Sequence, residues 1–267
     1  MTLYIIGNGF DLKHDIPTRY SDFAKFVANS NIVLFKQIES CLCNLSPNGL
    51  WSNFEEALGT QNIEELNKYY NRNIKENRDN PIGINDSALK SAFHDWIISL
   101  KRYILHCVHV PRIAFVENAC FLSFNYTNTL EDVYGISPHK IYHIHGYVDS
   151  KDKEQENLYV GYIYGHGREK SSLTEYEEFE IKETINFFKK DYQTGKLSKL
   201  CENKWFSDII ILGHSIGLVD ASYFNFLNKK YTDAKWHIGY FNDADLINKI
   251  KRCDILKIRN PHFFIEQ

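Results

Sequence analysis

The chain has 267 residues, of which 43% are hydrophobic, so it can bury a substantial core and lies near the upper end for one domain. Its 31 basic and 34 acidic residues give a net charge of −3, and no arm or stripe concentrates lysine and arginine as a nucleic-acid surface does. This balance argues against nucleic acid as the main partner. We expect a single domain over residues 1–267 that carries a large insertion.

The six cysteines form no repeated C-x-x-C pair, which argues against a zinc ribbon and against a disulfide framework. They stand at positions 41, 43, 107, 120, 201 and 253. Cys107 and Cys120 lie in apolar surroundings that are typical of buried thiols. No charged-then-apolar leader opens the chain, and no apolar run approaches the ~20 residues that cross a bilayer. We therefore expect a cytoplasmic protein without a membrane partner.

The N-terminal run Thr2 to Asp11 is an apolar strand that leads directly into a glycine-spaced turn. Tyr4, Ile5 and Ile6 form the unbroken apolar block of a strand that is buried on both faces of a parallel sheet. Gly7 and Gly9 remove two side chains where such a strand turns toward a helix, so backbone N–H groups could approach a phosphate. The ordinary dinucleotide fingerprint would place a third glycine at position 12, where this chain has Leu12. A nucleotide site and a bare tight turn both fit this stretch.

Residues 18–108 separate this strand from the next one and are mainly helical in pattern. After a loop over 11–17, helical spacing begins near residue 20, continues over 32–45 and returns strongly over 87–106. We interpret 18–108 as a helical insertion or cap.

Strand and helix patterns then alternate to the end of the chain. Strands are expected at 119–123, 140–145, 158–163, 207–212 and 235–240, and helices at 125–131, 175–192, 219–230 and 243–253. This alternation predicts an α/β fold with a Rossmann-like, mostly parallel sheet, helices on both faces and a large helical insertion after the first strand. The charged residues around 173–203 predict lid helices, although such helices are also ordinary packing elements.

Polar residues follow four of these strands, and the carboxyl ends of parallel strands share one edge of a sheet. They are Asn8 and Asp11, Asn125, His145, and the pair His214 and Ser215. Each has a structural alternative: Asn125 or Ser215 could cap a helix, and Asp220 could favour a helix dipole. His143 and His145 alternate along a strand, so they would face the same way, either as core histidines or as two metal ligands.

Several motifs, taken in order, resemble the abortive-infection AbiH family of bacterial phage-defence proteins. They are Gly7-Asn-Gly-Phe-Asp11, Ile16-Pro-Thr18, Tyr20-Ser-Asp-Phe23, Trp51-Ser-Asn-Phe-Glu55, Ser123-Phe-Asn-Tyr-Thr127, His143-Ile-His-Gly146 and Gly213-His-Ser215 with Asp220. The resemblance covers nearly the whole chain and implies a role in anti-phage defence. It also implies a phage-derived trigger or a partner defence protein, and leaves open whether copies of the chain assemble.

The same order is more remotely similar to sirtuin-like domains, which implies NAD as substrate or ligand and no resident metal. Asn125 would be the counterpart of the catalytic asparagine and His145 of the catalytic histidine. Two roles stay open for Asp11: it stabilises positive charge on the ribose, or it only caps the glycine turn. The implied cofactor-binding residues are Gly7, Asn8, Gly9, Phe10, Gly213, His214, Ser215 and Asp220, of which Gly213 and Ser215 hold the adenosine end. Two positions depart from the sirtuin pattern. Sirtuins have Ser or Thr a few residues after the glycines, where this chain has Phe10 and Asp11, and they continue from the Ile-Pro motif into Phe-Arg, where this chain has Thr18 and Arg19.

The zinc-binding cysteine quartet of protein deacylases is absent from the sequence, so we expect cleavage of the nicotinamide–ribose bond and not deacylation. That reaction passes through an oxocarbenium-like transition state and needs little covalent help. Two alternatives stay open. The protein could bind the nucleotide without cutting it, as a sensor or scaffold for a partner, or it could be a metal-dependent hydrolase or nuclease that uses His143, His145 and His166.

Overall fold

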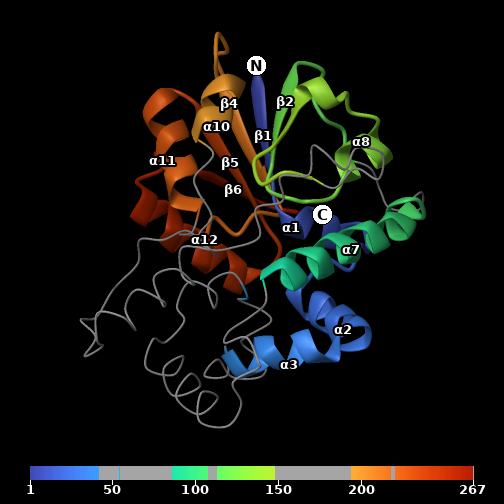
Figure 1. Ribbon diagram of the computed structural model, residues 1–267. Helices are drawn as coiled ribbons and strands as arrows, with labels where there is room; N and C mark the ends of the chain where they lie inside the picture. Colours follow the sequence, from blue (N-terminus) through green and yellow to red (C-terminus); the bar gives the residue numbers. More distant parts are fainter. Residues whose placement is uncertain (42–53, 55–85, 108–112, 148–193, 218–219, 267) are drawn as a thin grey trace. The chain divides into compact units, whose positions relative to one another are not determined.

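The computed structural model describes six stretches of the chain, separated by gaps (Figure 1). They are residues 1–41, 54, 86–107, 113–147, 194–217 and 220–266. The strand expected at 158–163, the helix expected at 175–192 and most of the expected lid lie outside these residues. The chain divides into two compact units. One comprises Met1–Thr18, Ile97–Leu158 and Tyr192–Gln267, and the other comprises Arg19–Trp96 and Tyr159–Asp191.

The first unit is built on a six-stranded sheet in which every described pairing is parallel. Its strands are β1 (Thr2–Ile6), β2 (Ala119–Ser123), β3 (Ile141–His143), β4 (Asp208–Leu212), β5 (Lys235–Tyr240) and β6 (His262–Ile265). They lie in the order β3-β2-β1-β4-β5-β6, with Tyr4 of β1 opposite Phe121 and Ile210. This order is that of a doubly wound sheet and confirms the predicted fold class.

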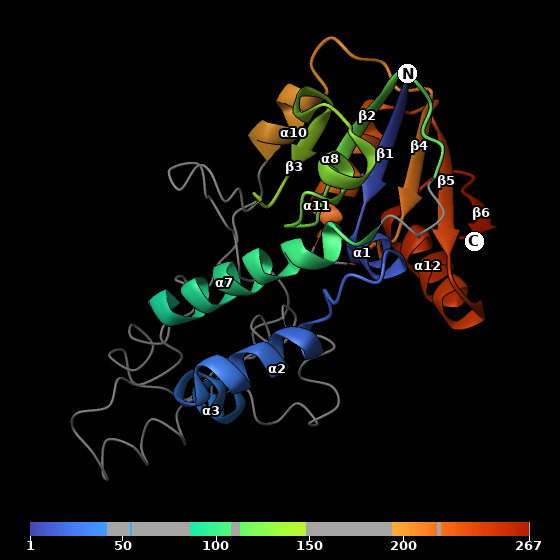
Figure 2. The same cartoon turned by 90° about the vertical axis from the view of Figure 1, so that its right-hand side faces the viewer.

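Alternate side chains of β1 enter two apolar cores, one on each face of the sheet. Figure 2 shows the strands of the sheet with helices around them. Leu3 and Ile5 pack in one core with residues of α10 (Thr194–Leu200), α11 (Ala221–Lys230) and α12 (Asp243–Leu256). Tyr4 and Ile6 pack in the other with residues of α1 (Asn8–Lys13) and α8 (Thr129–Tyr134). Because both faces are covered, the strands read as continuous apolar runs. A short 3-10 helix, η2 (Pro138–Lys140), precedes β3.

The second unit is helical in its described part, as predicted for the segment after β1. It contains α2 (Tyr20–Ser30), α3 (Ile32–Cys41) and the first part of α7 (Asp86–Ile104). Phe23 is fully buried, with ring centroids 5.3 Å from Phe93, 5.1 Å from Trp96 and 6.0 Å from Phe54. This aromatic cluster joins α2 to α7 and gives the unit a core of its own.

Three local expectations were wrong. The loop expected to begin at Asp11 begins later, because α1 already runs from Asn8 to Lys13 and buries Phe10 and Asp11. The strand expected to extend to His145 ends at His143, and residues 144–145 form a turn. The short edge strand β6 was missed, because four residues that lie on an exposed edge carry little periodic signal.

Candidate functional site

The carboxyl ends of β1 and β4 meet where the strand order reverses, which is the point where doubly wound sheets bind ligands. Backbone hydrogen bonds join the turn after β1 to the end of β4. The Gly7 N–H donates to the Leu212 carbonyl at 3.0 Å, and the Gly9 N–H donates to the Gly213 carbonyl at 2.7 Å. A Cβ on Gly213, whose φ is +64°, would lie 2.0 Å from the Phe10 nitrogen. The glycines therefore allow two backbones to approach closely, and the Gly7 and Gly9 N–H groups already bond to the last residue of β4 and to the residue after it.

Asp11 lies beneath this turn and is only 1% exposed. Its two carboxylate oxygens accept hydrogen bonds from the hydroxyls of Thr127, at 2.5 Å, and Thr129, at 2.7 Å. Burial raises the pKa of Asp11 from 3.8 to about 6, although the hydrogen bonds from Thr127, Thr129 and Asn125 oppose this shift. Asp11 thus ties α1 to Thr127 and to Thr129, the first residue of α8.

Asn125 follows β2 and is buried above Asp11. Its side-chain Nδ2 donates to the Gly7 carbonyl at 3.1 Å, and it also contributes a hydrogen bond to the Asp11 carboxylate. Its backbone N–H donates to the Ser123 hydroxyl at 3.2 Å. The amide N–H groups therefore fix Asn125 against the glycine turn, and Oδ1 is the atom that could orient a water or a hydroxyl.

His145, Asp220 and His214 form a buried row at the same edge. His145 Nε2 lies 3.7 Å from Asp220 Oδ1, and His214 Nε2 lies 3.5 Å from Asp220 Oδ2. The Ile216 N–H donates to His214 Nδ1 at 2.9 Å. The Phe124 ring packs against both imidazoles, with centroid distances of 5.3 Å to His145 and 4.4 Å to His214. One buried carboxylate therefore faces two buried histidines, which follow β3 and β4.

His143 does not share this row, contrary to the expectation that it would face the same way as His145. Its Nδ1 contacts the Asn125 carbonyl oxygen at 3.1 Å, and its Nε2 contacts Glu131 Oε1 of α8 at 2.8 Å. The reason is that β3 ends at His143, so the alternation of a strand does not reach His145. The two histidines therefore contact different partners, Glu131 and Asp220, and His166 lies outside the described residues. Among the residues that the structure describes, no group of three or more His, Cys, Asp or Glu is arranged to hold a metal ion.

The remaining predicted binding residues differ in how exposed their side chains are. Asn8 and Ser215 are exposed, and Asn8 Nδ2 donates to the Thr18 carbonyl at 3.0 Å. The Phe10 side chain is buried and packs on Phe115 and Tyr134, so only its backbone could face a ligand.

Sequence reasoning missed the roles of four residues at the site. They are Thr127, Thr129, Glu131 and Glu266. The three after β2 could have been suspected, because they closely follow a motif residue. Glu266 gave no signal: its Oε1 accepts the Gly213 N–H at 3.0 Å, but it follows a strand that was not predicted.

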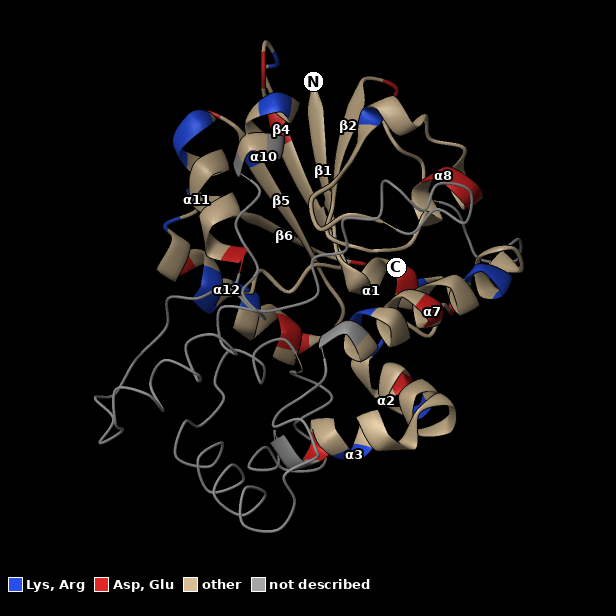
Figure 3. Cartoon of the chain, in the orientation of Figure 1, with Lys and Arg blue, Asp and Glu red and all other residues tan. Residues whose placement is uncertain are grey.

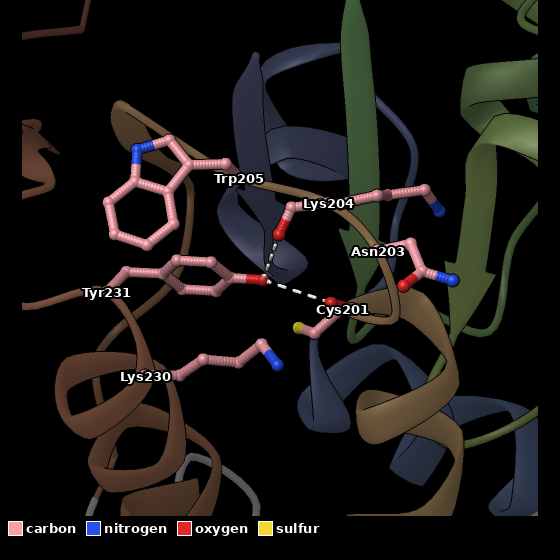
Figure 4. A pocket seen from close by; sticks show the side chains of 6 residues that line it. All are labelled: Cys201, Asn203, Lys204, Trp205, Lys230 and Tyr231. Atoms are coloured by element: carbon pink, nitrogen blue, oxygen red, sulfur yellow. Dashed lines mark hydrogen bonds between the residues drawn. The ribbon is translucent and has the colours of Figure 1, made fainter.

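A separate pocket of about 360 Å³ lies at the opposite, amino end of β4 (Figure 4). It is lined by Cys201, Asn203, Lys204, Trp205, Lys230 and Tyr231. The Tyr231 hydroxyl donates to the Lys204 carbonyl, and Lys230 lies in the last turn of α11, where a cation complements the helix dipole. Tyr231 and Lys230 thus have structural explanations, and none of the six lining residues belongs to the polar edge.

The charged residues of the described helices are mixed in sign (Figure 3). Among these helices, none has both the length and the hydropathy that a membrane span needs.

The fold and the site define a doubly wound α/β protein with a buried polar cluster where its strand order reverses. The family model for bacteriophage abortive infection AbiH matches residues 3–240. The chain therefore belongs to the AbiH family, as its ordered motifs predicted. A search of curated proteins found no match. The remote similarity to sirtuin-like domains stays a prediction.

Proposed function

We propose that this AbiH-family protein serves phage defence by hydrolysing NAD⁺ at the nicotinamide–ribose bond. One observation carries the proposal: Asn125, His145 and Asp220 follow three different strands, β2, β3 and β4, and are all buried at the edge that holds the glycine turn. The reversal point of a doubly wound sheet suits a dinucleotide, and a buried edge that combines an imidazole, an amide and carboxyls suits proton transfer.

In the proposed reaction the bond between ribose C1′ and the nicotinamide nitrogen breaks, and nicotinamide leaves with the bonding electrons. Water adds to C1′, and its proton passes to neutral His145 and then to solvent, so the products are nicotinamide, ADP-ribose and a proton. Asn125 Oδ1 orients the water or a ribose hydroxyl. Asp11, which the sequence suggested as a direct stabiliser of the ribose cation, is 1% exposed and acts through the Asn125 amide.

The ligand would lie across the exposed groups of the edge. Asn8 and Ser215 are the exposed polar side chains on the two sides of the β1–β4 junction, and Gly213 and Gly9 lie between them. These residues remain our candidates for binding the nucleotide. Because the Gly7 and Gly9 N–H groups bond to β4, we expect a phosphate to be held mainly by side chains and water.

The test is nicotinamide release from NAD⁺ by the purified protein, alone and with lysate from phage-infected cells. Asn125→Ala and His145→Ala should each lower the rate by about 10²–10⁴-fold while the fold stays intact. His237→Ala is the matched control. That histidine pairs with Asp208 at the start of β4, 3.1 Å away and at the other end of the sheet, so its loss should leave the rate unchanged.

Equal activity in wild type and both site variants would refute the assignment of those residues. A folded protein that binds NAD⁺ or ADP-ribose saturably but releases no nicotinamide in either condition would replace hydrolysis with a nucleotide-binding sensor. The lysate arm would then identify whether a phage component or a partner defence protein changes that binding.

A further inference from the structure

Asp220 is the N-cap residue of α11, but its carboxylate does not accept a capping hydrogen bond. An aspartate at this position ordinarily accepts an N–H from the first turn of its helix. Here the two carboxylate oxygens instead face His145 Nε2 and His214 Nε2, at 3.7 and 3.5 Å. The residue is 8% exposed, and burial of a carboxylate is costly unless donors compensate it. Helix capping therefore does not explain why an aspartate stands here.

A hydrogen bond to Nδ1 of His214 determines which nitrogen of this ring carries the proton. The Ile216 N–H donates to His214 Nδ1, so in the neutral imidazole the proton lies on Nε2, the nitrogen that faces Asp220. The backbone after β4 thus fixes the tautomer of His214 and directs a donor at one oxygen of the carboxylate. This leaves the other oxygen, Oδ1, to face His145.

We propose that Asp220 is a positioning residue for His145, held in place by His214, and not a direct nucleotide ligand. Asp220 keeps the proton of neutral His145 on Nε2, which places the lone pair on Nδ1. It also stabilises the imidazolium that forms when Nδ1 takes a proton. This is the logic of an acid–base pair oriented by a third group. The inference rests on the proposed function in one respect: the proposed hydrolysis supplies the proton that His145 accepts.

Asp220 is a carboxylate that faces the His145 ring directly. The titratable groups near this ring include Asp220 and, across it, His214, with the phenols of Tyr126 and Tyr223 at ring-centroid distances of 6.2 and 6.0 Å. Phe124 contributes an apolar wall. An opposite charge within about 4–6 Å shifts a titration by about 1 pH unit or more, so loss of the carboxylate should be visible at His145 itself.

The test is histidine-detected NMR on ¹⁵N-histidine-labelled protein, which reports tautomer and titration of each ring. Asp220→Asn should lower the titration midpoint of His145 by about 1 pH unit and shift its tautomer balance away from Nε2–H. Glu131→Gln is the matched control: it removes the negative charge that faces His143 and should change the His143 signal while leaving His145 as in the wild type. His214→Gln, which keeps a donor, should preserve the His145 signal better than His214→Ala.

The kinetic arm separates positioning from binding. Asp220→Asn should lower kcat for nicotinamide release by about 10²–10⁴-fold with KM little changed. A raised KM with an unchanged His145 titration would overturn the proposal and make Asp220 a ligand-binding residue. If the wild type releases no nicotinamide, the proposed hydrolysis fails, but the NMR arm still decides whether Asp220 controls His145.

Discussion

Asp11 should make the protein less stable as pH rises from about 4 to about 6. Burial raises its pKa from 3.8 to about 6, so between these values the folded state holds a proton that the unfolded chain releases. The stabilisation is fully present below the unfolded pKa and is lost as pH rises through the folded pKa. A shift of about 2 units corresponds to about 3 kcal/mol.

The assay is urea unfolding of wild type and Asp11→Asn at a series of pH values from 4 to 7.5. The free energy of unfolding of the wild type, relative to the variant, should fall by about 2.5 kcal/mol over this range. Glu266, whose pKa is also raised chiefly by burial, is present in both proteins, so its effect cancels. Thr129→Val removes a hydrogen bond that favours the ionised carboxyl, so it should move the transition to higher pH. Parallel curves for wild type and Asp11→Asn would refute the reasoning.

Three further perturbations test the structure. Gly213→Ala should lower the free energy of unfolding by about 3 kcal/mol or more, because its Cβ would meet the Phe10 nitrogen at 2.0 Å. Gly135→Ala has a similar φ of +65° but open space around its Cβ, so it should lower this free energy by only about 1 kcal/mol. Equal losses of stability in thermal unfolding would contradict the close approach at Gly213. Burial is the main cause that lowers the pKa of His14, so the wild type should lose stability relative to His14→Gln as pH falls through about 6.5. A difference in unfolding free energy that does not change with pH would exclude this linkage. Phe23→Ala should destabilise the helical unit by about 3–5 kcal/mol in urea unfolding, and a cost near zero would show that the aromatic cluster is not a core.

Local sequence patterns were sufficient for most of the secondary structure. β2 and β5 were predicted at their observed bounds, because apolar runs bounded by turn residues are short-range features. The same patterns predicted that Asn125 and His145 would gather at one edge, since the carboxyl ends of parallel strands always share an edge. The family also followed from the sequence, because its motifs occur in order along nearly the whole chain.

Only the tertiary structure decided which groups became partners. The sequence placed His145 with His143, but the early end of β3 turns them to different neighbours, Asp220 and Glu131. The sequence allowed the N–H groups near Gly7 and Gly9 to approach a phosphate, whereas the N–H groups of these two glycines bond to Leu212 and Gly213 at the end of β4, more than 200 residues away in the sequence. Such pairings depend on strand order and on side-chain packing across long stretches of chain. Periodicity within a few residues carries no information about them.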